Sequence, residues 1–216
     1  AVVFLTLIFS HHFAVIGSLT TASILFVILL LVTVYLSLKQ QALYLAMLAL
    51  SMAYLAPLVI PQNHPDVIFL FAYYLLINLA VAAVNFIQPW KILHQIAFFA
   101  TMFIGGAVIG IYAKTQQFAT LDWILWLHIA LFIWLSVRYS QLMLRVKNHD
   151  LNLNQDTGQK TQRLQPILDV GLIFSVPVLG FSLHAYLMHN STQAMTLGAV
   201  ALAIVYISLN LWIKRQ

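Results

Sequence analysis

Polar side chains inside long apolar segments are the residues of this sequence that could do chemistry. Asn78, His128, Asp169 and His184 each fall within such a segment. Polar and ionisable groups are costly in a membrane, so they either clamp helices together or line a path for ions or substrates. For Asn78 we expect a clamp to another helix, with a translocation path as the alternative. For Asp169 we expect a place in the first turn of a helix after Pro166, where the helix end favours a carboxylate, with proton coupling as the alternative.

The histidines raise the question of a metal site. His128 and His184 are predicted to lie at similar depths on neighbouring antiparallel helices, where they could ligate a metal ion or the iron of a porphyrin. The alternative is that each ring hydrogen-bonds a neighbouring carbonyl or hydroxyl group. The chain has no cysteine, which excludes thiolate catalysis and Cys-based zinc sites. We predict no metal and no cofactor, with His128 and His184 as the ligands that the alternative would use.

The apolar segments that hold these residues define the fold class. Hydrophobic residues make up 62% of the 216 residues and charged residues only 7%, whereas soluble domains are about 25% charged. A soluble domain is therefore excluded. About 20 apolar residues span a bilayer, and continuous runs favour helices over a barrel. We predict an all-α, polytopic transmembrane bundle that forms a single domain over residues 1–216, with the end of an eighth span at 1–10 and seven full spans at 19–38, 42–60, 67–87, 92–113, 121–144, 167–188 and 193–213.

Lys and Arg predict how these spans are oriented. If seven spans alternate in direction, nine of the ten Lys and Arg residues fall on one face of the membrane and only Lys114 falls on the other. Cytoplasmic loops carry the excess of positive charge, so the loop 145–166 and the C-terminal end are predicted to be cytoplasmic. The basic isoelectric point then reports topology, and no nucleic-acid partner is expected.

Small residues predict where helices pack closely. Five alanines recur at spacings of four and three along the second span, and a GxxxG motif lies on the fourth. Such stripes let helix backbones approach each other in lipid. We expect packing within the chain, with self-dimerisation as the alternative. The residues concerned are Ala42, Ala46, Ala49, Ala53, Ala56, Gly106 and Gly110.

Four stretches of the chain form a recognisable set: residues 47–60 (MLALSMAYLAPLVI), the span and tryptophan at 67–91, the helix entry 118–123 (FATLDW), and 168–174 (LDVGLIF) with Pro177 and Phe181. Together they resemble the bacterial membrane proteins grouped as domain-of-unknown-function family 2339. The sequence departs from the family pattern at His184, where glutamine is usual, and in lacking a double glycine before Leu55. The resemblance implies a longer parent protein and no known activity, and it singles out Asp122, Asp169 and Pro177.

These observations predict a function only at the level of class. We expect an integral membrane module that is a helical-bundle part of a larger bacterial envelope protein, in the inner membrane. Its partners would be the lipid bilayer and other membrane subunits or the remainder of the chain. One alternative is a transporter or flippase with a polar path near Asn78, His128, Asp169 and His184. A second is a His-ligated metal or heme protein. No nucleophile–base pair, phosphate-binding loop or HExxH motif favours an enzyme.

Overall fold

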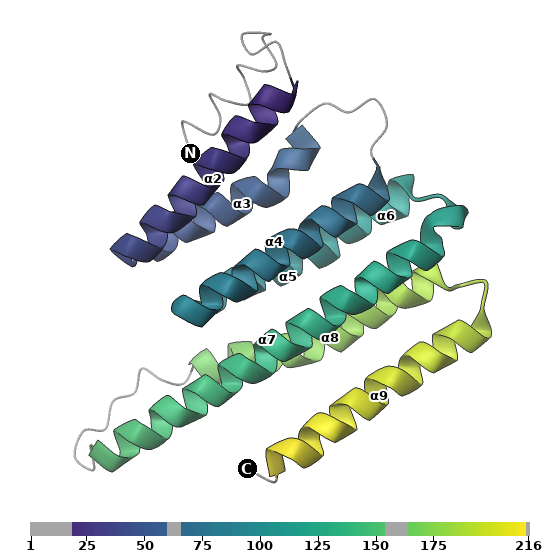
Figure 1. Ribbon diagram of the computed structural model, residues 1–216. Helices are drawn as coiled ribbons and strands as arrows, with labels where there is room; N and C mark the ends of the chain where they lie inside the picture. Colours follow the sequence, from purple (N-terminus) through teal and green to yellow (C-terminus); the bar gives the residue numbers. More distant parts are fainter. Residues whose placement is uncertain (1–18, 60–65, 154–163, 215–216) are drawn as a thin grey trace. The chain divides into compact units, whose positions relative to one another are not determined.

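The computed structural model describes residues 19–59, 66–153 and 164–214, and every element in these ranges is helical (Figure 1). The elements are α2 (Leu19–Gln40), α3 (Leu43–Val59), α4 (Val67–Ile87), α5 (Lys91–Phe99), the π-helix η1 (Ala100–Gly105), α6 (Gly106–Tyr112), the 3₁₀ turn η2 (Thr115–Gln117), α7 (Phe118–Leu153), α8 (Leu164–Leu187) and α9 (Thr192–Lys214). The all-α prediction is confirmed.

Most helices coincide with the predicted apolar segments. The predicted loop 145–166 is wrong in part, because α7 continues to Leu153 and α8 already begins at Leu164; a helix does not have to end where the apolar residues end, since its backbone hydrogen bonds can continue through polar residues in water. Among the described residues, four helical stretches are long and apolar enough to cross a membrane: Val67–Ile87, Lys91–Tyr112, Thr115–Gln141 and Thr192–Leu211. Three shorter apolar helices are Val27–Gln40, Leu43–Pro57 and Ile173–Leu187. The predicted end of an eighth span at 1–10 lies outside the described residues. That the three shorter helices also cross the membrane remains a prediction.

The chain divides into two compact units, Ala1–Gly105 and Gly106–Gln216, called here the N-terminal and the C-terminal unit. In the N-terminal unit, α3 packs against α2, α4 and α5, and α4 also packs against α5 and η1. Phe71, Tyr74 and Phe98 are fully buried in the centre of this unit. Helix α4 begins after Asp66, whose carboxylate accepts hydrogen bonds from the N–H groups of Ile68 and Phe69. This cap satisfies two of the donors that open the helix.

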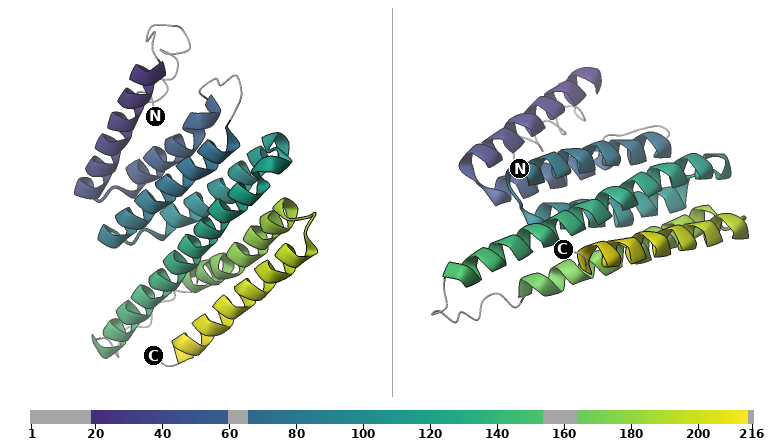
Figure 2. Two further views of the ribbon diagram at one scale, coloured as in Figure 1. Left: turned by 45° about the vertical axis from the view of Figure 1, so that its right-hand side comes forward. Right: turned by 60° about the horizontal axis from the view of Figure 1, so that its bottom comes forward.

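In the C-terminal unit, α7 packs against α8, and α8 packs against α9; both views of Figure 2 show α7 and α8 side by side. Gly180 permits the approach of α8 to α7, because a Cβ atom there would lie 2.8 Å from Ile129 Cδ1. Helix α9 contributes much less to the core. In the most apolar 18-residue stretch of α9, only 11% is buried, against 50% in the corresponding stretch of Lys91–Tyr112.

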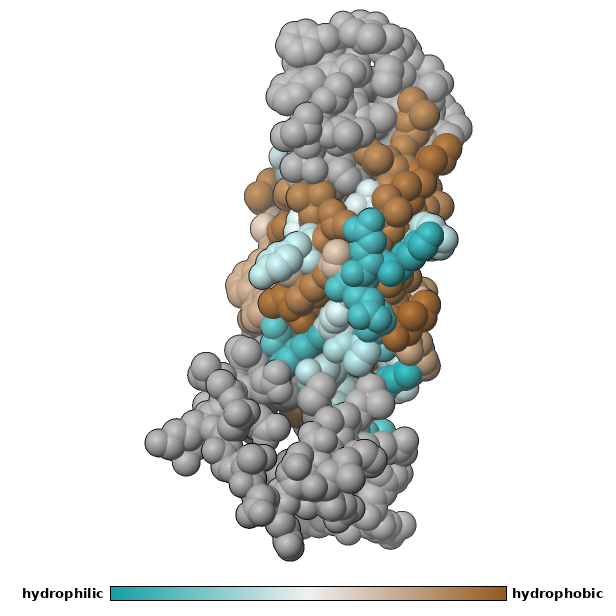
Figure 3. Space-filling model, turned by 90° about the vertical axis from the view of Figure 1, so that its left-hand side faces the viewer, coloured by the Kyte–Doolittle hydropathy of each residue, from teal (hydrophilic) through white to brown (hydrophobic). Residues whose placement is uncertain are grey.

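Large apolar side chains cover much of the described surface. Leu76, Ile111, Phe174 and Leu197 are each about two-thirds exposed or more. In Figure 3, apolar side chains occupy much of the described part of one face, beside a smaller polar area. Soluble monomers rarely expose apolar surface on this scale, so these side chains suit a lipid environment.

Candidate functional site

A buried polar cluster lies in the middle of the N-terminal unit. Asn78 on α4 accepts a hydrogen bond from the Tyr54 hydroxyl of α3, and its Nδ2 donates to Thr101 Oγ1 of η1 at 3.0 Å. All three side chains are buried. Asn78 is about 16 Å along the helix from Val67 and about 14 Å from Ile87, which is mid-depth in a bilayer core. One amide therefore joins three helical segments where water cannot satisfy it. Tyr54, Asn78 and Thr101 are called the Asn78 cluster below.

A proline and a tyrosine extend the cluster. Pro57 has no N–H, so the Ala53 carbonyl four residues earlier loses its helical donor. The Tyr73 hydroxyl of α4 donates to that carbonyl oxygen at 3.0 Å, and the neighbouring Tyr74 donates to Tyr54 O at 3.0 Å. Tyrosine side chains from the next helix thereby bond to two backbone oxygens of α3 in the turn before Pro57.

The π-helix supplies the third member of the cluster. Thr101 lies in η1, between α5 and α6. Gly105 ends this segment, and a Cβ there would lie only 3.0 Å from Phe71 Cε2. Short π segments are rare and occur frequently at functional sites. Here the π segment presents a hydroxyl to Asn78 and a bare backbone to the Phe71 ring.

The C-terminal unit holds a second polar site, in which Asp122 and His184 meet. The Asp122 carboxylate oxygen Oδ1 on α7 lies 2.6 Å from His184 Nδ1 on α8. The other ring nitrogen, Nε2, lies 3.2 Å from the Ala194 carbonyl oxygen of α9. Gly198 makes this approach feasible, because a Cβ there would overlap the His184 ring, 2.6 Å from its Cδ2 atom. One imidazole thus ties three helices together.

The hydrogen-bond chemistry of this site assigns its protons. A carbonyl oxygen only accepts, so His184 Nε2 carries a hydrogen and donates to Ala194. The short contact on the other side then holds one further proton, either on Nδ1 beside a carboxylate or on Asp122 beside a neutral ring. Both arrangements have no net charge. The Asp122–His184 pair is therefore a buried, hydrogen-bonded pair without net charge in either arrangement.

Aromatic rings shield the pair. The Trp126 ring meets the His184 ring edge-on at 5.3 Å between centroids, and the Phe181 ring lies at 5.9 Å. Both Asp122 and His184 are buried. The site lies near the start of α7 and near the end of α8, close to one end of the unit.

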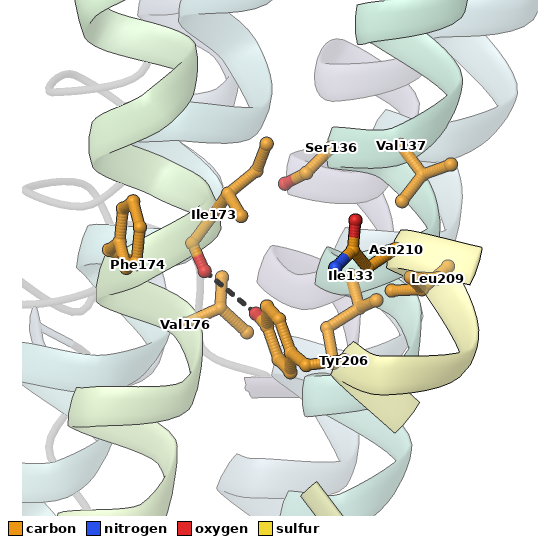
Figure 4. A pocket seen from close by; sticks show the side chains of 9 residues that line it. All are labelled: Ile133, Ser136, Val137, Ile173, Phe174, Val176, Tyr206, Leu209 and Asn210. Carbon is orange, nitrogen blue, oxygen red and sulfur yellow. Dashed lines mark hydrogen bonds between the residues drawn. The ribbon is translucent and has the colours of Figure 1, made fainter. Parts of the chain in front are cut away.

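The C-terminal unit repeats the proline device. Pro177 removes the helical donor of the Ile173 carbonyl, four residues earlier. The Tyr206 hydroxyl of α9 donates to this oxygen at 2.7 Å, as the dashed line in Figure 4 shows. Helix α9 is thus attached to α8 at two places: Ala194 O near its start bonds to His184, and the Tyr206 hydroxyl in its second half bonds to Ile173 O.

The two remaining predicted polar residues are His128 and Asp169. His128 is fully buried on α7, with its ring stacked on Phe132 at 6.4 Å. The predicted place of Asp169 in a first helical turn is wrong, because α8 begins at Leu164, before Pro166, and Asp169 is its sixth residue; its side chain lies outside the described residues. Within the described part of the chain, no three His, Cys, Asp or Glu side chains gather as a metal site would require. Both ring nitrogens of His184 already face oxygen atoms of the chain.

The predicted packing residues occupy varied environments. Ala46, Ala49, Ala53 and Ala56 are buried, whereas Ala42 is half-buried. A Cβ at Gly106 would lie 3.9 Å from Leu183, and one at Gly110 would meet nothing within 4 Å. The Gly110 carbonyl instead accepts a hydrogen bond from the Tyr186 hydroxyl at 3.4 Å.

Sequence reasoning missed the partners at both sites: Tyr54, Tyr73, Thr101, Ala194 and Tyr206. Prolines at 57 and 177 indicate which carbonyls need a new donor, namely those of Ala53 and Ile173. Tyrosines on the helices that follow are suitable donors for these carbonyls, so the proline–tyrosine combination was the signal from which the partners could have been predicted. Nothing local distinguishes Thr101 or Ala194.

Comparison with known proteins agrees with this architecture. The profile of a family described as "Predicted membrane protein (DUF2339)" matches residues 1–216. No curated protein and no protein of known structure gives a significant match to the chain.

Proposed function

The chain belongs to the DUF2339 family of predicted membrane proteins, and from this premise we propose that it is a non-catalytic helical module of a larger bacterial envelope protein. The module sits in the inner membrane, with the connection between α7 and α8, including the end of α7 at residues 145–153, and the C-terminal end in the cytoplasm. Its surroundings are the lipid bilayer and other membrane subunits or further parts of the same protein.

The Asn78 cluster is the observation that carries this proposal. A substrate path needs polar groups that can exchange partners with a passing ion or molecule. The amide of Asn78 instead has its oxygen and its nitrogen bonded to two neighbouring helices, and Tyr73 and Tyr74 bond backbone oxygens of α3. Hydrogen bonds between membrane helices stabilise by about 0.6 kcal/mol on average and up to about 1.7. These groups favour a structural role.

A matched pair of asparagines on α4 tests the structural role. Asn78→Leu leaves the Tyr54 and Thr101 hydroxyls without the amide, and we expect it to lower the free energy of unfolding by about 1–3 kcal/mol. Asn85→Leu makes the same change seven residues later on the same face of α4. The described residues supply no hydrogen-bond partner for this buried amide. This substitution should be neutral or stabilising. Equal losses at both positions, measured by denaturant unfolding in detergent, would contradict the clamp.

The Asp122–His184 pair favours a second candidate, a transporter coupled to protonation. A buried, hydrogen-bonded carboxyl–imidazole pair inside membrane helices is the kind of group that can couple proton binding to helix movement. Its link to Ala194 O offers a means, since a change in His184 protonation would alter the bond that holds α9.

Cysteine accessibility separates the two candidates, because the chain has no cysteine of its own. If the module is structural, Ala194→Cys in oriented vesicles should react with an impermeant maleimide from one side of the membrane and not from the other, at acidic and at neutral pH alike. Labelling that switches sides between acidic and neutral pH, and that Asp122→Asn abolishes, would establish the transporter instead.

A further inference from the structure

A cavity of about 340 Å³ lies among α7, α8 and α9 (Figure 4). Its wall is mainly apolar, with Ile133 from α7, Val176 from α8 and Leu209 from α9. Small-molecule sites are typically hollows of about 300–1,000 Å³ with mostly apolar linings and a few placed polar groups. An apolar hollow of this kind does not hold ordered water well, because water needs two to four polar partners. An apolar occupant suits it better.

Three polar side chains line the cavity, and they differ in whether they have a hydrogen-bond donor left for a ligand. The Tyr206 hydroxyl donates its hydrogen to Ile173 O, and the Ser136 hydroxyl donates to Phe132 O at 2.8 Å. Neither has a hydrogen left for a ligand. The Asn210 amide projects from α9 towards the cavity in Figure 4, and no hydrogen bond to it is found among the described residues. Its two N–H groups are the donors that remain for a ligand.

The depth of Asn210 identifies the chemistry that would meet this donor. Asn210 lies four residues before Lys214, the last residue of α9, which is about 6 Å along the helix. An amide so close to a helix end lies near the boundary between the hydrocarbon core and the headgroups. The ester carbonyls of glycerolipids lie at this boundary, and a carbonyl is a pure acceptor that matches a free N–H donor.

We propose that this cavity binds one acyl chain of a membrane glycerolipid, with the ester carbonyl accepting a hydrogen bond from Asn210 Nδ2. The chain fills the space between Ile133, Val176 and Leu209. The bound lipid also supplies contacts that α9 lacks, since α9 buries little of its own apolar surface. This assignment adds a ligand to the module and does not depend on whether the module is structural or transports a substrate.

Two leucines on α9 provide a matched test. Leu209 lines the cavity and is half-buried, whereas Leu211 does not line it and is exposed. The full chain is purified in mild detergent, washed with added detergent, and examined by native mass spectrometry for a retained glycerolipid. The wild type and Leu211→Trp should retain it in stoichiometric amount. Leu209→Trp places an indole in the cavity and should abolish retention.

A second variant keeps the test decisive if Leu209→Trp disturbs folding. Asn210→Leu preserves the cavity and removes the donor, so it should weaken glycerolipid retention about three- to tenfold at an unchanged unfolding midpoint, as loss of one hydrogen bond predicts. Asn210→Gln should restore part of the retention. Equal retention in all variants would mean non-specific annular lipid only, and no retained lipid in the wild type would mean an empty cavity. Either result overturns the proposal.

Discussion

The two units use the same local device in different surroundings. In each, a proline frees a carbonyl and a tyrosine from the next helix donates to it: Tyr73 to Ala53 O in the N-terminal unit, and Tyr206 to Ile173 O in the C-terminal unit. The first bond lies beside the fully buried Asn78 cluster. The second borders a cavity and attaches a largely exposed helix. A proline–tyrosine clamp can thus reinforce a packed core or attach a weakly packed helix, and the neighbouring side chains decide which.

The largest effect is expected where the clamp is packed most tightly. Ala53 is 1% exposed, so Ala53→Leu would push α4 or α5 away from α3 and disturb the carbonyl that Tyr73 bonds. Overpacking of this kind costs about 1–3 kcal/mol, and we expect the upper end. Unfolding in detergent measures it. Leu55→Phe, on the exposed face of α3, is the enlarging control. A loss no greater than that of the control would show that this core is not tightly packed.

In the C-terminal unit the corresponding weak point is Gly198. Gly198→Ala would drive a methyl group into the His184 ring and break its bond to Ala194 O, at an expected cost of about 1–2 kcal/mol. Gly110→Ala is the matched control, because a Cβ there meets nothing within 4 Å. If the two variants unfold at the same denaturant concentration, α9 is not held through His184.

A smaller effect tests whether each tyrosine acts through its proline. Tyr73→Phe removes the donor to Ala53 O and should cost about 1 kcal/mol. In a Pro57→Ala background the restored N–H satisfies that carbonyl, so Tyr73→Phe should then cost almost nothing. The double-mutant cycle isolates this coupling. Additive losses would mean that the Tyr73 hydroxyl stabilises the unit in some other way.

The smallest coupling is expected for Pro177 and Tyr206. The same cycle, with Pro177→Ala and Tyr206→Phe, should give a coupling energy of about 0.5 kcal/mol, because Tyr206 is only partly buried and its helix packs weakly. A coupling larger than that of Pro57 with Tyr73 would reverse the comparison, and α9 would then be the more firmly attached element.

Local pattern predicted most of the described helices, but not the end of α7, which continues to Leu153 in the segment predicted as a loop. The apolar run at 67–87 coincides with α4, and the runs at 92–113 and 193–213 lie within one residue of the observed segments. Span length and hydropathy are local properties, and a membrane leaves the backbone little choice other than a helix. The same reasoning predicted that Asn78 needs a partner on another helix, because an isolated amide in lipid is costly.

What only the tertiary structure decided is which groups meet. Tyr54 and Thr101 lie 24 and 23 residues from Asn78, and His184 lies 62 residues from Asp122. Such meetings depend on the rotation and axial shift of each helix, which arise from packing at positions such as Gly180 and Gly198. The π-helix at Ala100–Gly105 has no local signal either, since it follows the same apolar pattern as its flanks. Hydropathy constrains the depth of a residue but leaves the neighbours of its side chain open, and for that reason the sequence predicted the polar residues and the fold supplied their partners.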